Sequence, residues 1–363
     1  MPMSANTPNG RCKSTRCVLT AGVLFVLGFF FAWTTAKRAN PTQSPPSGDL
    51  GTRVAAKSWQ APQSRPSATH DRAVAQLATS RLRAQRILTY GHGDGQLGMV
   101  HEQDQPQVGP ESFAVGKDGT ILVADVVNQR IAVYSRDGTY LRAIELPGIV
   151  LGDVTADAQG RVYAYDQVRR ALHQYDAQGT PQSTLDLKPA DINIRGYFHV
   201  AGNSVYFADA ALRDVLVATL QDGVLRPADT AVACTTDGVH GDSGRIYSMS
   251  LDKGQTLRLQ LRDSATQSVA QSLEVPLPGI VSARFAGEDE AKRFYIQTER
   301  LDGSSIALEV LAFSPSGEQL AATRMPENDY AIWIAKLVDV RTDGTIVQFL
   351  PQHEQAKLNL FTN

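Results

Sequence analysis

Residues Gly109–Ile144 read GPESFAVGKDGTILVADVVNQRIAVYSRDGTYLRAI and contain the strongest structural pattern in the chain. Three short runs rich in apolar and β-branched residues are separated by the turns Lys117-Asp118-Gly119 and Arg136-Asp137-Gly138. Glycine adopts a positive φ without a steric penalty, so each turn can close a tight hairpin. The stretch therefore predicts three consecutive antiparallel strands.

Weaker copies of the same pattern follow along the chain. The spacing from Gly119 to Gly160 is 41 residues, and the spacing from Gly138 to Gly179 is also 41 residues. Further copies are centred on the turns Gly202-Asn203, Ser243-Gly244, Gly287–Lys292 and Thr342-Asp343-Gly344. A repeat of about forty residues that consists only of strands predicts the blades of a β-propeller, and six copies predict six blades.

The two ends of the repeat region predict how the ring closes. The last copy supplies strands at Thr345–Leu350 and Lys357–Phe361, and Arg86–Tyr90 can add the outer strand of this blade. Joining the first and last segments in one sheet removes an open edge. The expected fold is all-β, with a six-bladed propeller over residues 81–363.

An apolar segment precedes the repeats. Val18–Trp33 is almost wholly apolar, and its extension to 17–36 is about the 20 residues that cross a bilayer core. Basic residues stand just before it and favour a cytoplasmic N-terminus over residues 1–16, namely Arg11, Lys13 and Arg16. A single-pass signal anchor is expected, with the body on the periplasmic or extracellular side. The alternative is a secretory signal that is cleaved after Thr34-Thr35-Ala36.

Residues 37–80 have the composition of a linker between the apolar segment and the repeats. They are rich in Pro, Ser and Ala, and such a segment cannot bury enough apolar surface to fold. Near its end, Val74, Leu77, Ala78 and Leu82 fall on one face at 3.6 residues per turn. This pattern predicts a short helix within Asp71–Gln85.

The composition narrows the classes of function. The net charge is −2 and no strongly basic region lies outside the N-terminus, so no nucleic-acid partner is expected. Of the three cysteines only Cys234 belongs to the expected folded body, which leaves it without a partner for an internal disulfide. His-x-x-x-His and Cys-x-x-Cys pairs are absent, as is a Gly-x-Ser-x-Gly elbow.

The segment from Asp118 to Tyr134 resembles a blade of the NHL type of propeller. It contains an Asp-Gly turn, a strand that ends in Asp125, and then Asn128 and Arg130 before an apolar strand. The resemblance implies that Asp125 and Arg130 pair across the hairpin in a structural role. It implies a ring-shaped fold but no activity, because such propellers serve binding, lyase and hydrolase functions alike. Later copies depart from the pattern at the Arg130 position, with Ala171 in the second and Asp214 in the third.

Candidate binding residues lie in the variable loops of one ring face. These loops are 91–109, 188–197, 227–241 and 325–336. Tyr330 and Trp333 precede the last inner strand, and Tyr197 ends another of the loops. Core packing is the commoner use of a tryptophan such as Trp333, because aromatic side chains mainly contribute buried area.

Metal-binding candidates come from different blades around the channel. His199 and His240 lie near the inner strands of adjacent blades and are the candidates for a zinc site. A calcium site would draw on acidic residues near the inner strands, namely Asp153, Asp237, Asp242 and Asp339. Because no local metal motif exists, no cofactor is expected, and zinc or calcium is the alternative.

Together these features favour a membrane-tethered, exported propeller that binds a protein or ligand without catalysis. An envelope or membrane protein is the expected partner, because a tether raises the effective concentration of the ring for its neighbours. The alternative is a metal-dependent hydrolase or lyase that acts on a small molecule in the central channel.

Overall fold

The structure is a computed structural model that describes residues 80–101, 107–187, 197–209, 213–228 and 235–362. All of them belong to the compact unit Ser64–Asn363, and the other unit is Met1–Gln63. The expected anchor at 17–36, the linker up to residue 79 and Cys234 fall outside the described residues. Within the residues that are described, no helix is long and apolar enough to span a membrane.

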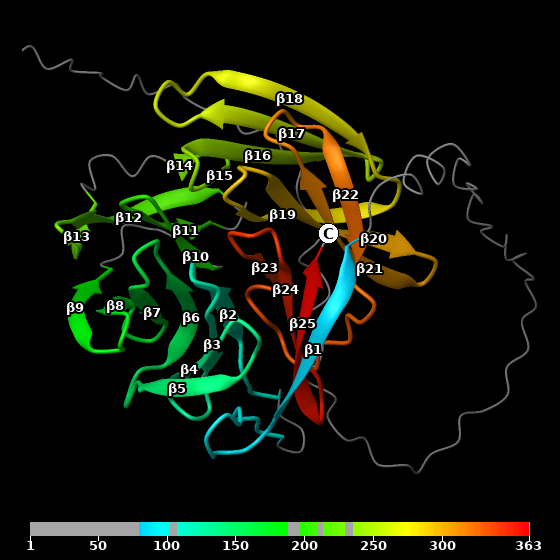
Figure 1. The fold of residues 1–363 in the computed structure, drawn as a ribbon. Helices are drawn as coiled ribbons and strands as arrows, with labels where there is room; N and C mark the ends of the chain where they lie inside the picture. The colour runs from blue at the N-terminus through cyan, green and yellow to red at the C-terminus, as the bar shows by residue number, and fades with distance from the viewer. Residues whose placement is uncertain (1–79, 102–106, 188–196, 210–212, 229–234, 363) are drawn as a thin grey trace, which may run out of the picture. The chain divides into compact units, whose positions relative to one another are not determined.

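Six antiparallel sheets follow one another along the chain and confirm the six predicted blades (Figure 1). Each blade is numbered in chain order. Blade 1 contains β2 Ser112–Val115, β3 Ile121–Asp125, β4 Arg130–Tyr134 and β5 Tyr140–Glu145. Blade 2 contains β6 Leu151–Ala156, β7 Val162–Asp166, β8 Ala171–Tyr175 and β9 Pro181–Asp186. Blade 3 contains β10 Phe198–Ala201, β11 Ser204–Ala208, β12 Asp214–Gln221, β13 Val224–Pro227 and the short β14 Thr235–Thr236, which pairs with β12.

The second half of the chain forms the other three blades. Blade 4 contains β15 Val239–His240, β16 Arg245–Asp252, β17 Thr256–Asp263 and β18 Val269–Pro276. Blade 5 contains β19 Ile280–Glu288, β20 Phe294–Asp302, β21 Ser305–Phe313 and β22 Gln319–Arg324. Blade 6 contains β23 Val338–Val340, β24 Ile346–Pro351, β25 Gln355–Thr362 and, as its outer strand, β1 Arg81–Thr89.

The first strand closes the ring by pairing with the last one. β1 runs antiparallel to β25, from Arg81 opposite Thr362 to Thr89 opposite Gln355. The predicted closure is therefore confirmed, and the strand begins five residues before the predicted Arg86. The helix expected over Asp71–Gln85 is wrong for its described part, because pairing with β25 outweighs the local helical pattern in residues 81–85.

Apolar side chains fill the seam between blade 6 and blade 1. Leu88 of β1, Phe113 of β2 and Phe349 of β24 belong to one buried cluster. The rings of Phe113 and Phe349 lie 5.6 Å apart. Because this cluster joins residues from both ends of the repeat region, the packing of this part of the core depends on closure of the ring.

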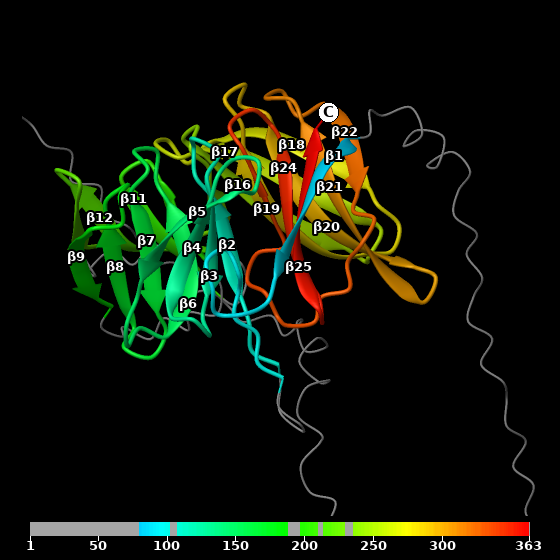
Figure 2. The same ribbon diagram turned by 60° about the horizontal axis from the view of Figure 1, so that its bottom comes forward.

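The ring has two distinct faces. One face carries the hairpin turns that follow the inner strands, such as the turns around Gly119, with φ of 86°, and Gly344, with φ of 84°. We call this the turn face, and β1 enters the ring on it because Arg81 pairs with Thr362 at the end of β25. The opposite face carries the connections between blades, including 325–337, and we call it the loop face (Figure 2).

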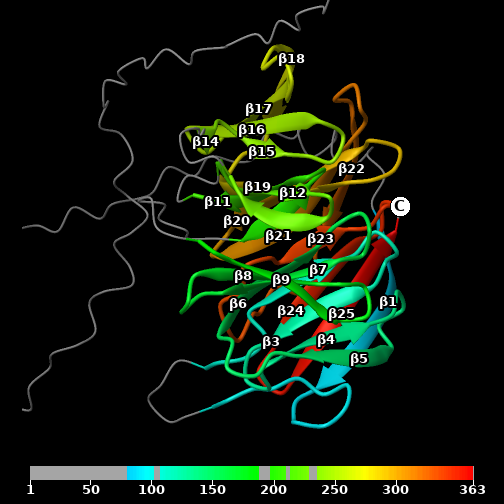
Figure 3. The same cartoon turned by 90° about the vertical axis from the view of Figure 1, so that its left-hand side faces the viewer.

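Blade 5 has a long hairpin that ends on the loop face. Its strands β20 and β21 have nine residues each, whereas β3 and β4 of blade 1 have five each. The end of this hairpin projects at the edge of the ring in Figure 2, and Figure 3 shows the ring from the side of blades 2 and 3. Leu301 and Ile306 are paired near its tip and are both exposed.

Candidate functional site

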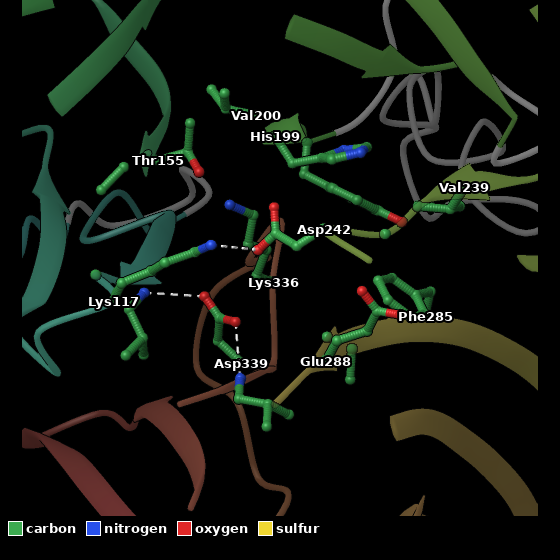
Figure 4. Close-up of a pocket in the computed structure, with 18 of the residues that line it drawn as sticks. Lys117, Thr155, His199, Val200, Val239, Asp242, Phe285, Glu288, Lys336 and Asp339 are labelled. Carbon is green, nitrogen blue, oxygen red and sulfur yellow. Dashed lines mark hydrogen bonds and ion pairs between the residues drawn. The ribbon is translucent and has the colours of Figure 1, made fainter. Parts of the chain in front are cut away.

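The inner strands of all six blades surround a central cavity of about 150 Å³ (Figure 4). Backbone and small apolar side chains form part of the wall, and Phe285 adds an aromatic ring. The rest of the lining is unusually rich in ionisable groups, which are Lys117, His199, His240, Asp242, Arg284, Glu288, Lys336 and Asp339. The cavity is thus a polar site held by a rigid sheet framework.

An ion pair crosses the channel at the turn face. Lys117 of blade 1 and Asp242 of blade 4 belong to blades on opposite sides of the propeller, and their charged atoms are 3.2 Å apart. Their side chains are 42% and 44% exposed. Exposed ion pairs contribute at most about 1 kcal/mol, so this pair can separate at little cost.

Asp214 brings the two candidate histidines together. Its Oδ2 accepts a hydrogen bond from the backbone N of His240 at 2.6 Å and lies 2.9 Å from Nδ1 of the same residue. Nε2 of His199 is 3.3 Å from Oδ2, within ion-pair distance but without an aligned hydrogen bond. The ring of Tyr206 stacks on His240 at 4.2 Å and on His199 at 5.6 Å. No motif in the sequence indicates a site at Asp214, which stands in the third copy at the position that Arg130 has in the first.

The negative charge of Asp214 and the positive charge of His199 stabilise each other. Burial lowers the pKa of His199, but the charge of Asp214 and its hydrogen-bonding oxygen together outweigh burial, so the pKa is raised above the usual 6.5. Burial raises the pKa of Asp214, but the charge of His199 and hydrogen bonds from His240 outweigh it and lower the pKa below 3.8. The ionised pair therefore stabilises the fold from the acid range up to the raised pKa of His199, and its contribution is lost on either side of that window.

Replacing Asp214 with asparagine is expected to reverse the direction in which the pKa of His199 is shifted. Without the carboxylate charge, burial dominates and the pKa of His199 should fall below 6.5. Titration of the His199 ring followed by NMR checks this, with the Asp237→Asn variant as a control because Asp237 is exposed and pairs with Arg262. A His199 pKa that stays above 6.5 in Asp214→Asn would contradict the assignment.

Buried carboxylates tie neighbouring inner strands together beside the cavity. Asp153 accepts hydrogen bonds from the backbone N of Phe198 at 2.7 Å and from the hydroxyl of Ser112. Asp339 accepts one from the backbone N of Val115 at 2.9 Å. Burial raises the pKa of both Asp153 and Asp339, although Lys336 and the hydrogen bonds oppose the rise. These contacts join blades 1, 2 and 3 on one side and blades 6 and 1 on the other.

Lys336 reaches across the cavity from the connection that precedes β23. Its Nζ donates to the carbonyl of Val154 at 3.1 Å and is 3.8 Å from Oδ1 of Asp153. Lys336, Arg284, Lys117 and Glu288 lacked any motif in the sequence. They come together only because the ring places residues from blades 1, 5 and 6 around one axis.

Some buried polar atoms of the site have no hydrogen-bond partner among the described residues. These atoms are the hydroxyl of Tyr197, Nδ1 of His199 and Oδ1 of Asp214. Tyr197 is 6% exposed, and burial raises the pKa of its hydroxyl to about 12. The guanidinium of Arg284 lies 4.8 Å above its ring. Buried polar atoms without partners are rare in folded proteins, so these atoms are free to bind a ligand.

Trp333 is 69% exposed on the loop face, so the expectation of core packing for this residue is wrong. The connection 325–337 carries it outward while Ile332 and Ile334 on either side are buried. Tyr330 is half-buried, and its hydroxyl accepts a hydrogen bond from Nε2 of Gln348 at 3.1 Å. Trp333 and Tyr330 line a second cavity of about 350 Å³, whereas Tyr197 lines the central one.

The ion pair expected between Asp125 and Arg130 is present in blade 1. Nε of Arg130 is 2.9 Å from Oδ2 of Asp125, and both side chains are buried. Asp125 also accepts from the backbone N of Gly98, and Arg130 donates to the carbonyls of Gly93 and Gln96. The pair therefore anchors the lead-in segment 91–98 to the blade.

Nearby arginines replace Arg130 in the next two blades. Arg169 lies 3.0 Å from Asp166 in blade 2, and Arg213 lies 2.6 Å from Asp209 in blade 3. In these two blades the arginine is closer in sequence to its aspartate than Arg130 is to Asp125. Neither arginine therefore stands at the position of Arg130 in the repeat.

The metal-binding alternatives are not assembled in the described part of the chain. There, no three His, Cys, Asp or Glu side chains are placed to hold a metal ion. His199 and His240 converge on Asp214, and Asp242 and Asp339 line the cavity. Asp237, in contrast, is directed to the surface.

The chain matches no known protein family and no curated protein. Among solved structures it is similar to a gluconolactonase of Xanthomonas campestris, with 15% identity, a TM-score of 0.43, and coverage of 79% of this chain and 98% of that one. It is similar to a streptogramin B lyase, with 11% identity, a TM-score of 0.42, and coverage of 76% and 97%. A Bacteroides vulgatus protein of the DUF4221 family shows 10% identity, a TM-score of 0.45, and coverage of 78% and 97%. These similarities concern the propeller fold alone.

Proposed function

We propose that this propeller is a non-catalytic binding module that takes a small polar ligand in its central cavity. The observation that carries the proposal is a pair of unpartnered buried atoms on residues that line the cavity, namely the Tyr197 hydroxyl and His199 Nδ1. Leaving a buried polar atom without a partner costs about 1–3 kcal/mol, and a ligand that bonds to it recovers this energy. A cavity of about this size accommodates a molecule roughly as large as benzene.

The site offers both donors and acceptors to such a ligand. Tyr197 and Lys336 can donate hydrogen bonds, and the carboxylate of Asp242 can accept one. The inner strands that carry these groups are tied together by Asp153 and Asp339, so little ordering is needed on binding. Preorganised groups of this kind favour affinity because the entropic cost of binding is reduced.

The competing proposal, a metal-dependent hydrolase or lyase, has less support from the arrangement of side chains. It would need ligands that converge on one point, and the described residues offer no group of three. Recognition without bond-making needs only the hydrogen-bonding groups that the cavity already presents.

Replacing Tyr197 with phenylalanine tests the binding proposal. Small polar molecules that bind the full-length protein in a ligand-observed NMR screen should bind the variant up to about tenfold more weakly, the value of one neutral hydrogen bond. Tyr134→Phe is the control. It also removes a tyrosine hydroxyl, but this hydroxyl belongs to blade 1, lies outside the cavity and donates a hydrogen bond to the carbonyl of Gly95. The proposal fails if no polar molecule binds, or if both variants bind all ligands as the wild type does.

The cellular setting is a further part of the proposal. The apolar segment 17–36 would tether the ring to the membrane on the periplasmic or extracellular side, near an envelope or membrane protein. Protease added to cells whose outer barrier has been opened, with the inner membrane left intact, should then degrade the propeller. A mature protein that starts at Lys37 would show instead that the segment is cleaved.

A further inference from the structure

The second cavity lies on the loop face, between blade 5 and the connection 325–337. We call it the Trp333 pocket, and its volume is about 350 Å³. One wall consists of β19 and β20 with Arg284, Gln297 and Glu299, and the other contains Tyr330, Ile332 and Trp333. It therefore combines a polar wall with an aromatic and apolar wall.

The polar wall contains one cation and one anion that are not paired. Among the described residues, no carboxylate lies within ion-pair distance of Arg284, and no basic group lies within that distance of Glu299. Arg284 donates to the carbonyl of Ala335. Glu299 accepts a hydrogen bond from Ser282 at 2.6 Å through Oε2. Both groups thus have donor or acceptor capacity left for a ligand.

The strand register makes these two residues neighbours. Arg284 pairs with Gln297, and Ser282 pairs with Glu299, so Arg284 and Glu299 are diagonal neighbours on one face of the sheet. The positions of such diagonal neighbours in the strands are about 7–8 Å apart. Gln297 lies between them, is 4% exposed and makes no side-chain hydrogen bond among the described residues. Gln297 lines the pocket, so a ligand bound there can form hydrogen bonds with its amide.

The aromatic and apolar wall of the pocket is suited to contact with an apolar group of the ligand. Trp333 is 69% exposed beside the pocket, whereas large aromatic side chains usually contribute buried area. Leu301 follows Glu299 on the same face of the sheet and is 56% exposed. An apolar body placed here would cover surface that the protein itself leaves in water.

We propose that the Trp333 pocket binds an α-amino acid in its zwitterionic form with an apolar side chain. The carboxylate would accept hydrogen bonds from Arg284 and from the amide of Gln297, and the ammonium would donate to Glu299. The side chain would lie against Trp333 and Ile332. Both side chains line the same pocket, so one zwitterion can bond to each of them through charge-assisted hydrogen bonds of about 2.8 Å. This site is separate from the central cavity, which Arg284 also borders.

Matched probes test which charges the pocket recognises. L-Leucine, 4-methylpentanoate and 3-methylbutylamine share an apolar chain, but only leucine carries both charges. In calorimetry or ligand-observed NMR with the full-length protein, leucine should bind about 10- to 100-fold more tightly than either analogue, since each lost charge removes a charge-assisted hydrogen bond. Equal affinity for leucine and an analogue, or no binding of leucine, would overturn the proposal.

Single substitutions assign the two ends of the ligand. Glu299→Gln should weaken leucine about 10- to 100-fold and leave 4-methylpentanoate unaffected or tighter, because it removes only the partner of the ammonium. Arg284→Gln should weaken leucine and 4-methylpentanoate but not 3-methylbutylamine. Glu274→Gln is the matched control, as this exposed carboxylate on β18 pairs with Arg258 and lies away from the pocket. An unchanged leucine affinity in Glu299→Gln, with an unchanged unfolding midpoint, would refute the assignment.

Discussion

A chain that begins at Tyr90 is expected to lose most of the stability that a chain beginning at Ser80 retains. The shorter chain lacks β1, so β25 becomes an open edge and the ring is no longer joined at blade 6. Leu88 is 5% exposed in the intact ring, and the loss of such a side chain alone costs about 2–5 kcal/mol. Removal of the whole strand should exceed this value, and denaturant unfolding of the two chains measures it.

The exposed side of the same strand provides an internal control. Ile87 is 56% exposed, so Ile87→Ala should change the free energy of unfolding by less than about 0.5 kcal/mol. The shorter chain should also aggregate, because an unpaired strand edge can pair with another chain. If the chains that begin at Ser80 and at Tyr90 unfold at the same denaturant concentration, the pairing of β1 with β25 does not stabilise the ring.

Replacing Asp125 with alanine is expected to lower the free energy of unfolding by about 3–5 kcal/mol, because Arg130 is then buried without its partner. The change also frees the backbone N of Gly98 and the side chain of Asn128, which both donate to Asp125. The lead-in segment 91–98 should therefore lose protection from hydrogen exchange before the rest of blade 1 does. Equilibrium unfolding and amide exchange measure the two effects.

A partly exposed ion pair on another hairpin is the matched comparison. Asp252 lies 3.0 Å from Arg258, with side chains 38% and 51% exposed, and Asp252→Ala should cost less than about 1 kcal/mol. Equal losses for Asp125→Ala and Asp252→Ala would show that burial of the Asp125–Arg130 pair has no special effect.

The strand pattern of the propeller could be predicted from the sequence because it is local. The turns at Gly119 and Gly138 join strands that are adjacent in the chain, and their residue preferences depend on backbone conformation alone. The extent of β1 was less predictable. Residues 81–85 show a helical pattern, and only pairing with β25 at the other end of the chain makes them a strand.

The candidate sites were predictable only in part. His199, His240 and Asp153 were singled out from their place near inner strands, and the ring brings them to the channel. Arg284, Glu299 and Lys336 carry no motif, and each was indistinguishable from an ordinary surface charge. Nothing in the chain order indicates that Lys117 meets Asp242 or that Arg284 covers Tyr197.

By itself, the sequence determined the number of blades, the order of their strands and the pairing of the first strand with the last. Glycine turns and the spacing of apolar residues encode each blade within some forty residues, and ring closure follows from strands that stand at the two ends of the repeat region. The tertiary structure decided which charges are paired and which buried atoms stay without partners. These properties depend on contacts between blades far apart in the chain, because a charge is neutralised by whatever lies near it in space, and the ring alone sets those neighbours.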